Sequence, residues 1–214
     1  MIAPILAIFC GPNGSGKTTL TKEIVRQGVQ LGRYINPDDI AAKISGSDEF
    51  RSKEAQRRAD EERERCLIEG CNFAFETVFS HPAKLHFMDR ASAAGYQIHV
   101  FFVSLPSPKM NVERVRLRAE SGGHDVPTER IIARWARTMA MLPEIAQRAD
   151  RLMVFDNGTP PDAPIIRLIA HGTRNENGTL DLLRDPNAPQ WLNTYLPVSS
   201  TQRHEPISPA RPTR

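Results

Sequence analysis

The residues with the clearest chemical potential form one short stretch, Gly11 to Thr18, which reads Gly-Pro-Asn-Gly-Ser-Gly-Lys-Thr. It fits the pattern G-x-x-x-x-G-K-[ST] at every fixed position, with an apolar run before it and a helix-forming segment after it. Glycines let a backbone curl so that successive N–H groups point inward at phosphate oxygens, and the positive end of the following helix strengthens that attraction. A Gly/Ser turn that matches by chance is the weaker alternative. We therefore expect this stretch to bind a nucleoside triphosphate.

Within this loop, two side chains have expected tasks of their own. Lys17 can reach the β- and γ-phosphates, and the Thr18 hydroxyl can hold Mg²⁺. The expected nucleotide-binding set is the whole loop and the next residue: Gly11, Pro12, Asn13, Gly14, Ser15, Gly16, Lys17, Thr18 and Thr19.

Carboxylates follow the next two expected strands. In an open α/β sheet, ligands lie at the carboxyl ends of the strands, which here selects Asp38, Asp39 and Glu76. A carboxylate beside the γ-phosphate can take the proton from an acceptor hydroxyl, or bind Mg²⁺ through water. We predict Asp38 as this base, with Asp39 in reserve. Capping of the helix after Pro37 is the alternative for both, and it is the better interpretation for Asp39.

Glu76 interrupts an otherwise apolar strand, and buried carboxylates are rare without a task. It could hold Mg²⁺ or accept a hydrogen bond from substrate, and an ion pair at the rim of the sheet is the plain alternative. Thr77 and Ser80 offer hydroxyls on the same edge, to substrate or to the helix that begins at Pro82. Asn157, after a later strand, could contact adenine, although Asn-Gly is first of all a turn signal.

A basic segment surrounds the loop Gly122–Pro127, which reads Gly-Gly-His-Asp-Val-Pro. A Gly-Gly hinge between two Arg-bearing helices is typical of a lid, here about residues 112–137, whose guanidinium groups neutralise a transferring phosphoryl group. For any one arginine, a solvated charge is an equal alternative. The arginines concerned are Arg114, Arg116, Arg118, Arg130, Arg134 and Arg137.

Strands and helices that could position these residues alternate along the chain, which favours an α/β fold with a parallel sheet and helices on both faces. We expect one domain over residues 1–196 and a disordered tail over 197–214, where the composition turns to Ser, Thr, Pro and Arg. The expected strands are 2–10, 33–36, 72–78, 96–105, 151–156 and an edge strand near 165–170. The expected helices are 19–27, 37–42, 50–69, 81–95, 108–120 and 128–148.

The composition is typical of an ordinary protein with a hydrophobic core, and we expect a cytoplasmic protein. Of the 214 residues, 40% are hydrophobic and 25% charged, so the chain can bury a core, and no apolar run approaches the ~20 residues of a membrane span. The three cysteines lack zinc spacing and are expected to be reduced thiols. A net charge of +3 suits an anionic substrate but does not by itself argue for nucleic acid.

The ordered set of motifs resembles the zeta-toxin family of P-loop kinases, over about residues 1–160. The motifs are Gly11-Pro-Asn-Gly-Ser-Gly-Lys-Thr-Thr, Tyr34-Ile-Asn-Pro-Asp-Asp-Ile, Phe75-Glu-Thr, Gly122-Gly-His-Asp-Val-Pro and Phe155-Asp-Asn. The resemblance implies a P-loop NTPase/kinase fold, a three-layer sandwich with a mostly parallel central sheet and a helical lid. It also implies ATP and Mg²⁺ as cofactors. Characterised zeta toxins phosphorylate the 3′-hydroxyl of the amino sugar in UDP-N-acetylglucosamine.

By the same resemblance, Asp38 matches the catalytic aspartate, Glu76 and Thr77 match the substrate contacts, and Arg118 and Arg134 match the lid arginines. It favours Glu76 as a substrate ligand over a metal ligand. The motif Asn-Pro-Asp-Asp departs from the Asp-Asn-Asp type of the best-known toxins, and little sequence follows the last core strand to build a large sugar-nucleotide pocket. Two alternatives therefore stay open: a kinase of nucleic-acid ends or of a nucleoside, and a non-catalytic ATP-binding switch. An antitoxin partner cannot be read from the sequence.

Overall fold

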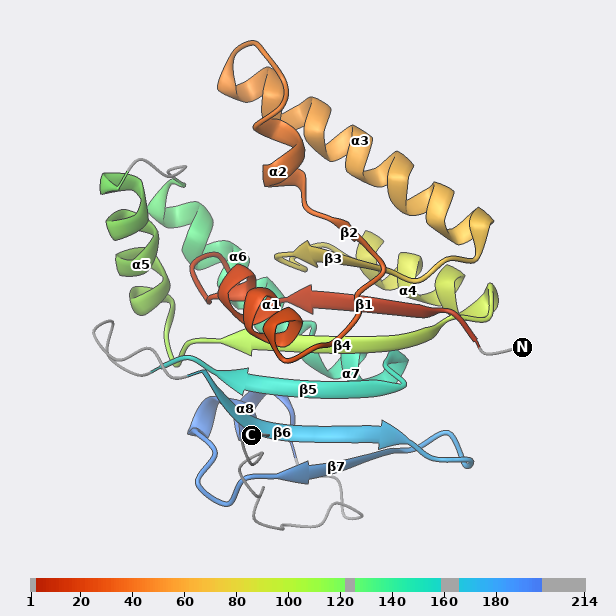
Figure 1. The fold of residues 1–214 in the computed structure, drawn as a ribbon. Helices are drawn as coiled ribbons and strands as arrows, with labels where there is room; N and C mark the ends of the chain where they lie inside the picture. The colour runs from red at the N-terminus through yellow and green to blue at the C-terminus, as the bar shows by residue number, and fades with distance from the viewer. Residues whose placement is uncertain (1–2, 122–125, 159–165, 198–214) are drawn as a thin grey trace.

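A seven-stranded sheet with the order β2-β3-β1-β4-β5-β6-β7 forms the centre of the molecule (Figure 1). The computed structural model describes residues 3–121, 126–158 and 166–197. The strands are β1 (Ile5–Cys10), β2 (Arg33–Ile35), β3 (Phe73–Thr77), β4 (Gln97–Ser104), β5 (Arg151–Asp156), β6 (Arg167–Arg174) and β7 (Leu180–Arg184). The helices are α1 (Lys17–Arg26), α2 (Pro37–Ala41), α3 (Asp48–Glu69), α4 (Ala83–Ala93), α5 (Pro108–Glu120), α6 (Thr128–Ala140), α7 (Leu142–Arg148) and α8 (Gln190–Tyr195).

The first five strands are parallel, which confirms the predicted α/β fold and its mostly parallel sheet. The prediction of an edge strand near 165–170 was wrong in one respect. β6 extends to Arg174 and pairs antiparallel with β5, and β7 lies outside it as the true edge strand. A tight turn joins the two strands, in which the Asn175 side chain accepts hydrogen bonds from the backbone N–H groups of Asn177 and Thr179.

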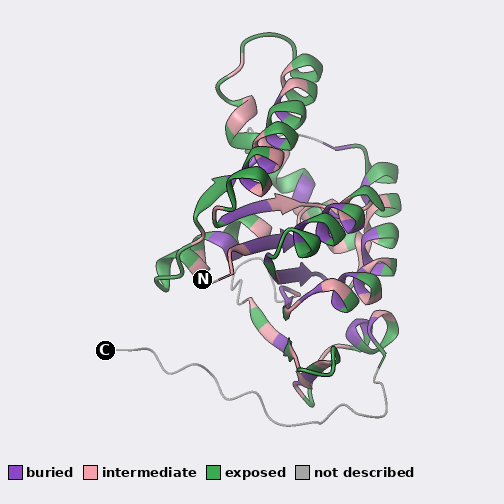
Figure 2. Cartoon of the chain, turned by 90° about the vertical axis from the view of Figure 1, so that its right-hand side faces the viewer, coloured by how far each residue is buried: buried purple, intermediate pink, exposed green. Residues whose placement is uncertain are grey.

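The helices form a layer on each face of the sheet. α1 covers one face, and α4, α6, α7 and α8 lie on the other (Figure 1). The larger hydrophobic core lies beneath the second layer, where Phe102, Met88 and Leu192 are fully buried, and a smaller core lies beneath α1. Figure 2 shows that burial is concentrated in the central strands, while the helices expose their outer faces.

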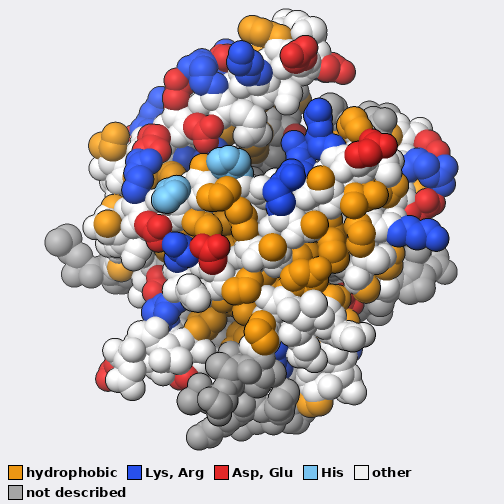
Figure 3. All heavy atoms as spheres, turned by 180° about the vertical axis from the view of Figure 1, so that it is seen from behind, with side chains coloured by type: hydrophobic (Ala, Val, Ile, Leu, Met, Phe, Trp, Pro, Cys, Tyr) orange, Lys and Arg blue, Asp and Glu red, His pale blue; other side chains and the backbone are white. Residues whose placement is uncertain are grey.

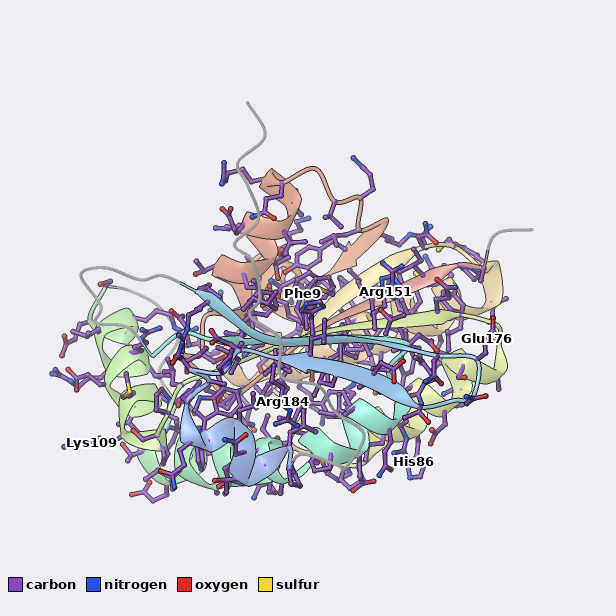
Figure 4. All side chains as sticks on the ribbon, turned by 90° about the horizontal axis from the view of Figure 1, so that it is seen from below. Phe9, His86, Lys109, Arg151, Glu176 and Arg184 are labelled. Carbon is purple, nitrogen blue, oxygen red and sulfur yellow. The ribbon has the colours of Figure 1, made fainter. Side chains whose placement is uncertain are left out.

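From behind, apolar side chains gather over this second layer (Figure 3). A shallow groove there is lined by Pro106 after β4, Trp135 on α6, and Trp191 and Tyr195 on α8. The buried Arg184 of β7 lies between the sheet and α8 (Figure 4), where it donates hydrogen bonds to Asn193 and to the carbonyl of Pro197.

The helix expected over residues 128–148 is two helices, and this expectation was also wrong. α6 ends at Ala140 and α7 begins at Leu142. Pro143 has no N–H to donate to the carbonyl four residues earlier, so the first helix cannot continue through it.

The predicted lid corresponds to α5 and α6, which contact each other. Residues 122–125, with the Gly-Gly-His-Asp part of the lid loop, lie outside the described residues, and so does the predicted tail except Pro197. Among the described residues, no helix is both long and apolar enough to cross a membrane.

Candidate active site

The carboxyl ends of β1, β2 and β3 meet at one edge of the sheet because these strands are parallel neighbours. The loop Gly11–Gly16 follows β1 and leads into α1. Asn36 and α2 follow β2, and Glu76 and Thr77 end β3. The structure therefore brings together the loop and both predicted sources of carboxylates (Figure 1).

The loop requires its glycines. Gly11, Gly14 and Gly16 have φ of 148°, 73° and 99°, in the left-handed region that other residues rarely adopt. A Cβ on Gly11 would lie 2.0 Å from the carbonyl oxygen of Val103, and one on Gly16 would lie 2.4 Å from Nδ2 of Asn157. The pattern of three glycines is therefore dictated by both conformation and space.

Unsatisfied hydrogen-bonding groups show that this loop fits a phosphate chain. Within the described residues, the backbone N–H groups of Asn13, Gly14 and Gly16 have no acceptor. The Ser15 hydroxyl and Asn13 Oδ1 are likewise buried without a partner. Several N–H donors at the start of α1 suit the oxygens of an anion. The residues present thus fit a nucleoside triphosphate.

Lys17 is folded back onto this loop. Its Nζ donates hydrogen bonds of 3.0 Å to the carbonyls of Gly11 and Pro12. Burial lowers the pKa of Lys17, whereas the negative charges of Glu76 and Asp38 act in the opposite direction. Both carboxylates are therefore close enough to act on the charge of the ammonium group.

Glu76 accepts three hydrogen bonds from hydroxyl groups. The donors are Thr18 at 2.8 Å, Thr21 at 2.9 Å and Tyr34 at 2.6 Å. Burial and the bond to Glu76 raise the pKa of Tyr34, so the phenol stays protonated and remains a donor. Glu76 thus touches the predicted Mg²⁺ ligand Thr18 on one side and β2 on the other.

Asp38 and Asp39 lie in the first turn of α2, and neither caps it. Asn36 is the cap, since its side chain accepts from the N–H of Asp38 at 3.0 Å. Both carboxylates are exposed. Of the two, only Asp38 is near enough to Lys17 to affect its pKa.

Thr77 and Ser80 lie on the segment that leaves β3, and neither caps the next helix. The Thr77 hydroxyl accepts from the N–H of Phe79, and the first N–H of α4, that of Ala83, binds His81 Nδ1 instead. Phe79 is buried with φ of 58°, a strained conformation for a bulky residue. The loop after β3 is thus held in a conformation of measurable cost beside the site.

The arginines of the predicted lid divide into two groups. Arg118 lies near enough to Lys17 to lower its pKa, while Arg116 pairs outward with Glu113 and Glu120 and is a surface charge. Arg134 lies on α6, where burial and the charges of Arg130 and Arg137 lower its pKa. In the described part of the chain, no carboxylate pairs with these three α6 arginines, as would suit a site for an anion.

Asn157 contacts the loop directly. Its Nδ2 donates to the carbonyl of Ser15 at 2.9 Å, and its own carbonyl accepts from Arg114 at 2.7 Å. Asn111 on α5 makes a matching contact from the other side, to the carbonyl of Asn13 at 2.6 Å. The predicted contact between Asn157 and adenine stays a prediction. So does the predicted part of Thr19 in nucleotide binding, since Thr19 is exposed on α1.

Three of the residues that make these contacts were given no role from the sequence: Tyr34, Thr21 and Asn111. Arg114 was predicted as a lid arginine, but its contact with the carbonyl of Asn157 was not predicted. One signal was available. Asn111, Arg114 and Arg118 are spaced i, i+3, i+7 and therefore share one face of α5. Thr21 lies one turn after Lys17 on α1 in the same way.

The site also fits Mg²⁺ in the manner usual for nucleotide enzymes. Within the described residues, no group of three His, Cys, Asp or Glu side chains could hold a metal ion. Mg²⁺ is usually held by one or two protein oxygens together with substrate phosphates and water. The Thr18 hydroxyl and the Glu76 carboxylate are oxygen donors of that kind, 2.8 Å apart.

A phosphate-binding loop after the first strand of a parallel sheet in the order β2-β3-β1-β4-β5 defines a P-loop kinase-like fold. The chain belongs to the AAA_33 family, described as an AAA domain, whose model matches residues 6–142. An uncharacterized protein of Haemophilus influenzae is 28% identical over 117 residues, which are 54% of this chain and 81% of that protein.

Solved structures share the fold at low sequence identity. The PezAT chromosomal toxin–antitoxin system of Streptococcus pneumoniae matches with a TM-score of 0.56 and 15% identity, over 78% of this chain and 71% of that one. The AvrRxo1-ORF1:ORF2 complex with ATP matches with a TM-score of 0.61 and 14% identity, over 83% of this chain and 60% of that one. The Pnkp1/Rnl/Hen1 RNA repair complex matches with a TM-score of 0.52 and 21% identity, over 64% of this chain and 45% of that one.

Proposed function

We propose that the protein is an ATP-dependent kinase that transfers the γ-phosphoryl group to a hydroxyl of a small anionic metabolite. A sugar nucleotide such as UDP-N-acetylglucosamine is the first acceptor to test. The observation that carries the proposal is the edge of the sheet where the loop with Lys17, the first turn of α2 with Asp38, and Glu76 at the end of β3 follow neighbouring parallel strands, with Glu76 bonded to Thr18 at 2.8 Å. Opposite charges gathered at a phosphate-binding loop are what phosphoryl transfer needs.

In this proposal the loop amides and Lys17 bind the phosphates, after Lys17 leaves the carbonyls of Gly11 and Pro12. Asp38 takes the proton from the acceptor hydroxyl, and its exposure leaves it accessible to an incoming molecule. Glu76 orients the acceptor, with Thr77, Ser80 and Asp39 as further contacts on the same edge. Mg²⁺, when bound beside Thr18, neutralises charge on the phosphates.

Arg118 and Arg134 complete the proposed site by drawing negative charge from the transferring group. The absence of carboxylate partners for Arg134 within the described residues supports this role, because the surface arginines of α3 are extensively paired. An anionic acceptor would also be attracted to Arg130 and Arg137 beside it.

The test is labelled ATP with a pooled metabolite extract, followed by UDP-N-acetylglucosamine alone. Transfer of label to a small molecule is the expected result, whereas ADP and free phosphate alone would favour the ATP-binding switch. Asp38→Asn should lower turnover by about 10²- to 10⁴-fold, the range for a general base, with ATP affinity nearly intact. A variant that keeps most of its turnover would remove Asp38 from this role.

A second candidate is a kinase of nucleic-acid ends, favoured by the shared fold with the Pnkp1/Rnl/Hen1 RNA repair complex. Titration of acceptor binding against salt separates the two, because an oligonucleotide that contacts many cations gives a steep salt dependence and a metabolite a shallow one. The shared fold with the PezAT toxin–antitoxin system supports the further proposal of a protein antitoxin as partner.

A further inference from the structure

The phosphate-binding loop has little internal support. Between Gly11 and Gly16, one backbone hydrogen bond closes a turn, from the N–H of Ser15 to the carbonyl of Pro12 at 3.3 Å. Glycine-rich backbone has more conformational freedom to lose than any other, so a preformed loop needs contacts from outside.

α5 supplies the first outside contact. Asn111 is fully buried, and its Nδ2 donates to the carbonyl of Asn13 at 2.6 Å. The helix also approaches Gly14 closely, since a Cβ there would lie 2.9 Å from the carbonyl oxygen of Asn111 and 3.1 Å from Val115.

The segment after β5 supplies the second contact. Asn157 is 3% exposed, and its Nδ2 donates to the carbonyl of Ser15 at 2.9 Å. Arg114 of α5 donates to the carbonyl of Asn157 at 2.7 Å, so the two supports are themselves joined.

Peptide planarity gives these two contacts a consequence for the ligand. The carbonyl of Asn13 belongs to the same rigid peptide plane as the N–H of Gly14, and the carbonyl of Ser15 to that of Gly16. In a trans peptide the two groups point in opposite directions. Holding each carbonyl outward therefore aims an N–H inward, and the N–H groups of Gly14 and Gly16 are among those that have no acceptor within the described residues.

We propose that Asn111 and Asn157 are positioning residues, which orient the Gly14 and Gly16 amides toward the phosphates before any nucleotide arrives. The inference rests on the proposed nucleotide binding and adds the means by which the loop is preorganised. It also makes the lid helix α5 part of the phosphate site through Asn111 and Arg114, rather than a cover that joins it only on closing.

The test compares Asn111→Ala and Asn157→Ala with Asn72→Ala. Asn72 is a control for the loss of a side-chain bond to backbone away from the loop, because its exposed side chain accepts from the N–H of Ile5 at 2.8 Å at the other end of the sheet. We expect each of the first two variants to lower the affinity for both ATP and pyrophosphate by about tenfold, the effect of one lost buried hydrogen bond. Asn72→Ala should bind both as the wild type does.

A second measurement needs no ligand. Hydrogen exchange of the loop amides in the nucleotide-free protein should be faster in Asn111→Ala and Asn157→Ala, and unchanged in Asn72→Ala. Unchanged affinity and exchange in the first two variants, or equal losses in all three, would overturn the inference. If the wild type bound neither ATP nor pyrophosphate, the proposed function would fail, while loop exchange would still decide whether the two asparagines hold the loop.

Discussion

Lys17 combines burial with a proposed task, phosphate binding, that needs its charge. Burial lowers its pKa below the ordinary value of 10.5, so the neutral amine appears at a lower pH than in most lysines. The carbonyls of Gly11 and Pro12 hold the ammonium group in place, and in the proposed function the phosphates would replace them as its partners.

We predict from this that ATP affinity falls at alkaline pH as Lys17 loses its proton. Only the protonated amine attracts the phosphates, so affinity should be full below the lowered pKa and decline as pH rises through it, before 10.5 is reached. Loss of one charged hydrogen bond corresponds to ~10- to 100-fold in affinity. Titration of ATP binding between neutral pH and pH 10 measures the decline. Lys17→Met cannot titrate, so this variant should bind ATP weakly at every pH and show no decline at alkaline pH. The same alkaline decline in the variant would mean that a group other than Lys17 causes it.

Experiment can separate the two roles considered for Glu76, ligand of the acceptor and ligand of Mg²⁺. As an acceptor ligand, its replacement in Glu76→Gln should raise the acceptor KM by about tenfold, in the range of a hydrogen bond to a charged group, and leave the Mg²⁺ requirement unchanged. Steady-state kinetics with acceptor and Mg²⁺ varied separately provide both values. A higher Mg²⁺ requirement with an unchanged acceptor KM would assign Glu76 to the metal, a role that its contact with Thr18 makes reasonable.

At the scale of single residues, the sequence identified those that belong to a motif and missed those that only form hydrogen bonds to it. Lys17 and Thr18 have fixed spacing because the loop has one shape, so their positions could be read directly. Tyr34 and Asn111 act through hydrogen bonds to partners 42 and 98 residues away, and no local pattern encodes such pairs.

Among the elements, α7 is held at its C-terminus by an arginine of a neighbouring strand. Arg174 on β6 donates to the carbonyls of Ala146, Gln147 and Ala149 at 3.2, 2.6 and 2.7 Å. A cation at this end of a helix satisfies carbonyls that lack partners and complements the helix dipole.

Arg174→Met should therefore lower the free energy of unfolding by about 2–3 kcal/mol, since several partly buried carbonyls lose a charged donor. Urea denaturation followed by circular dichroism measures the change. Arg167→Met is a control on the same strand, because Arg167 is more exposed. Among the described residues it makes one hydrogen bond, to the carbonyl of Asn187, and one ion pair, to Asp185 at 3.6 Å. ATP affinity should not change in either variant, and a loss confined to Arg167→Met would contradict the capping role.

Element boundaries were predictable where one local force dominates. β5 was predicted at Arg151–Asp156, as observed, because an apolar run ends at an Asn-Gly turn. The division of α6 from α7 depends on Pro143, whose effect in a helical pattern was not weighed. The antiparallel strand β7 escaped prediction because the alternation of strands and helices stops before it, although Asn177-Gly178 carried the signal of a hairpin.

On the scale of the whole molecule, the chain beyond the family match at residues 6–142 completes both the core and the site. β5 ends at Asp156, and the next residue, Asn157, contacts the phosphate-binding loop. α8 closes the larger core with Trp191 and Leu192, and the indole N–H of Trp191 donates to Asp156 Oδ1 at 2.9 Å. The C-terminal helix is thus connected to the nucleotide site through two consecutive residues.

Trp191→Phe tests this connection, because it keeps an aromatic ring in the core and removes the donor to a buried carboxylate. Asp156 is only 9% exposed, and an unsatisfied carboxylate oxygen there should cost about 1–3 kcal/mol of unfolding free energy. Trp135→Phe is the matched control, since within the described residues the Trp135 Nε1 is buried without a partner and its removal leaves no acceptor unsatisfied. Chemical denaturation of both variants gives the comparison. Equal losses would mean that ring packing rather than the bond to Asp156 anchors α8, whereas a loss specific to Trp191→Phe makes the C-terminal helix a support of the strand that carries Asn157.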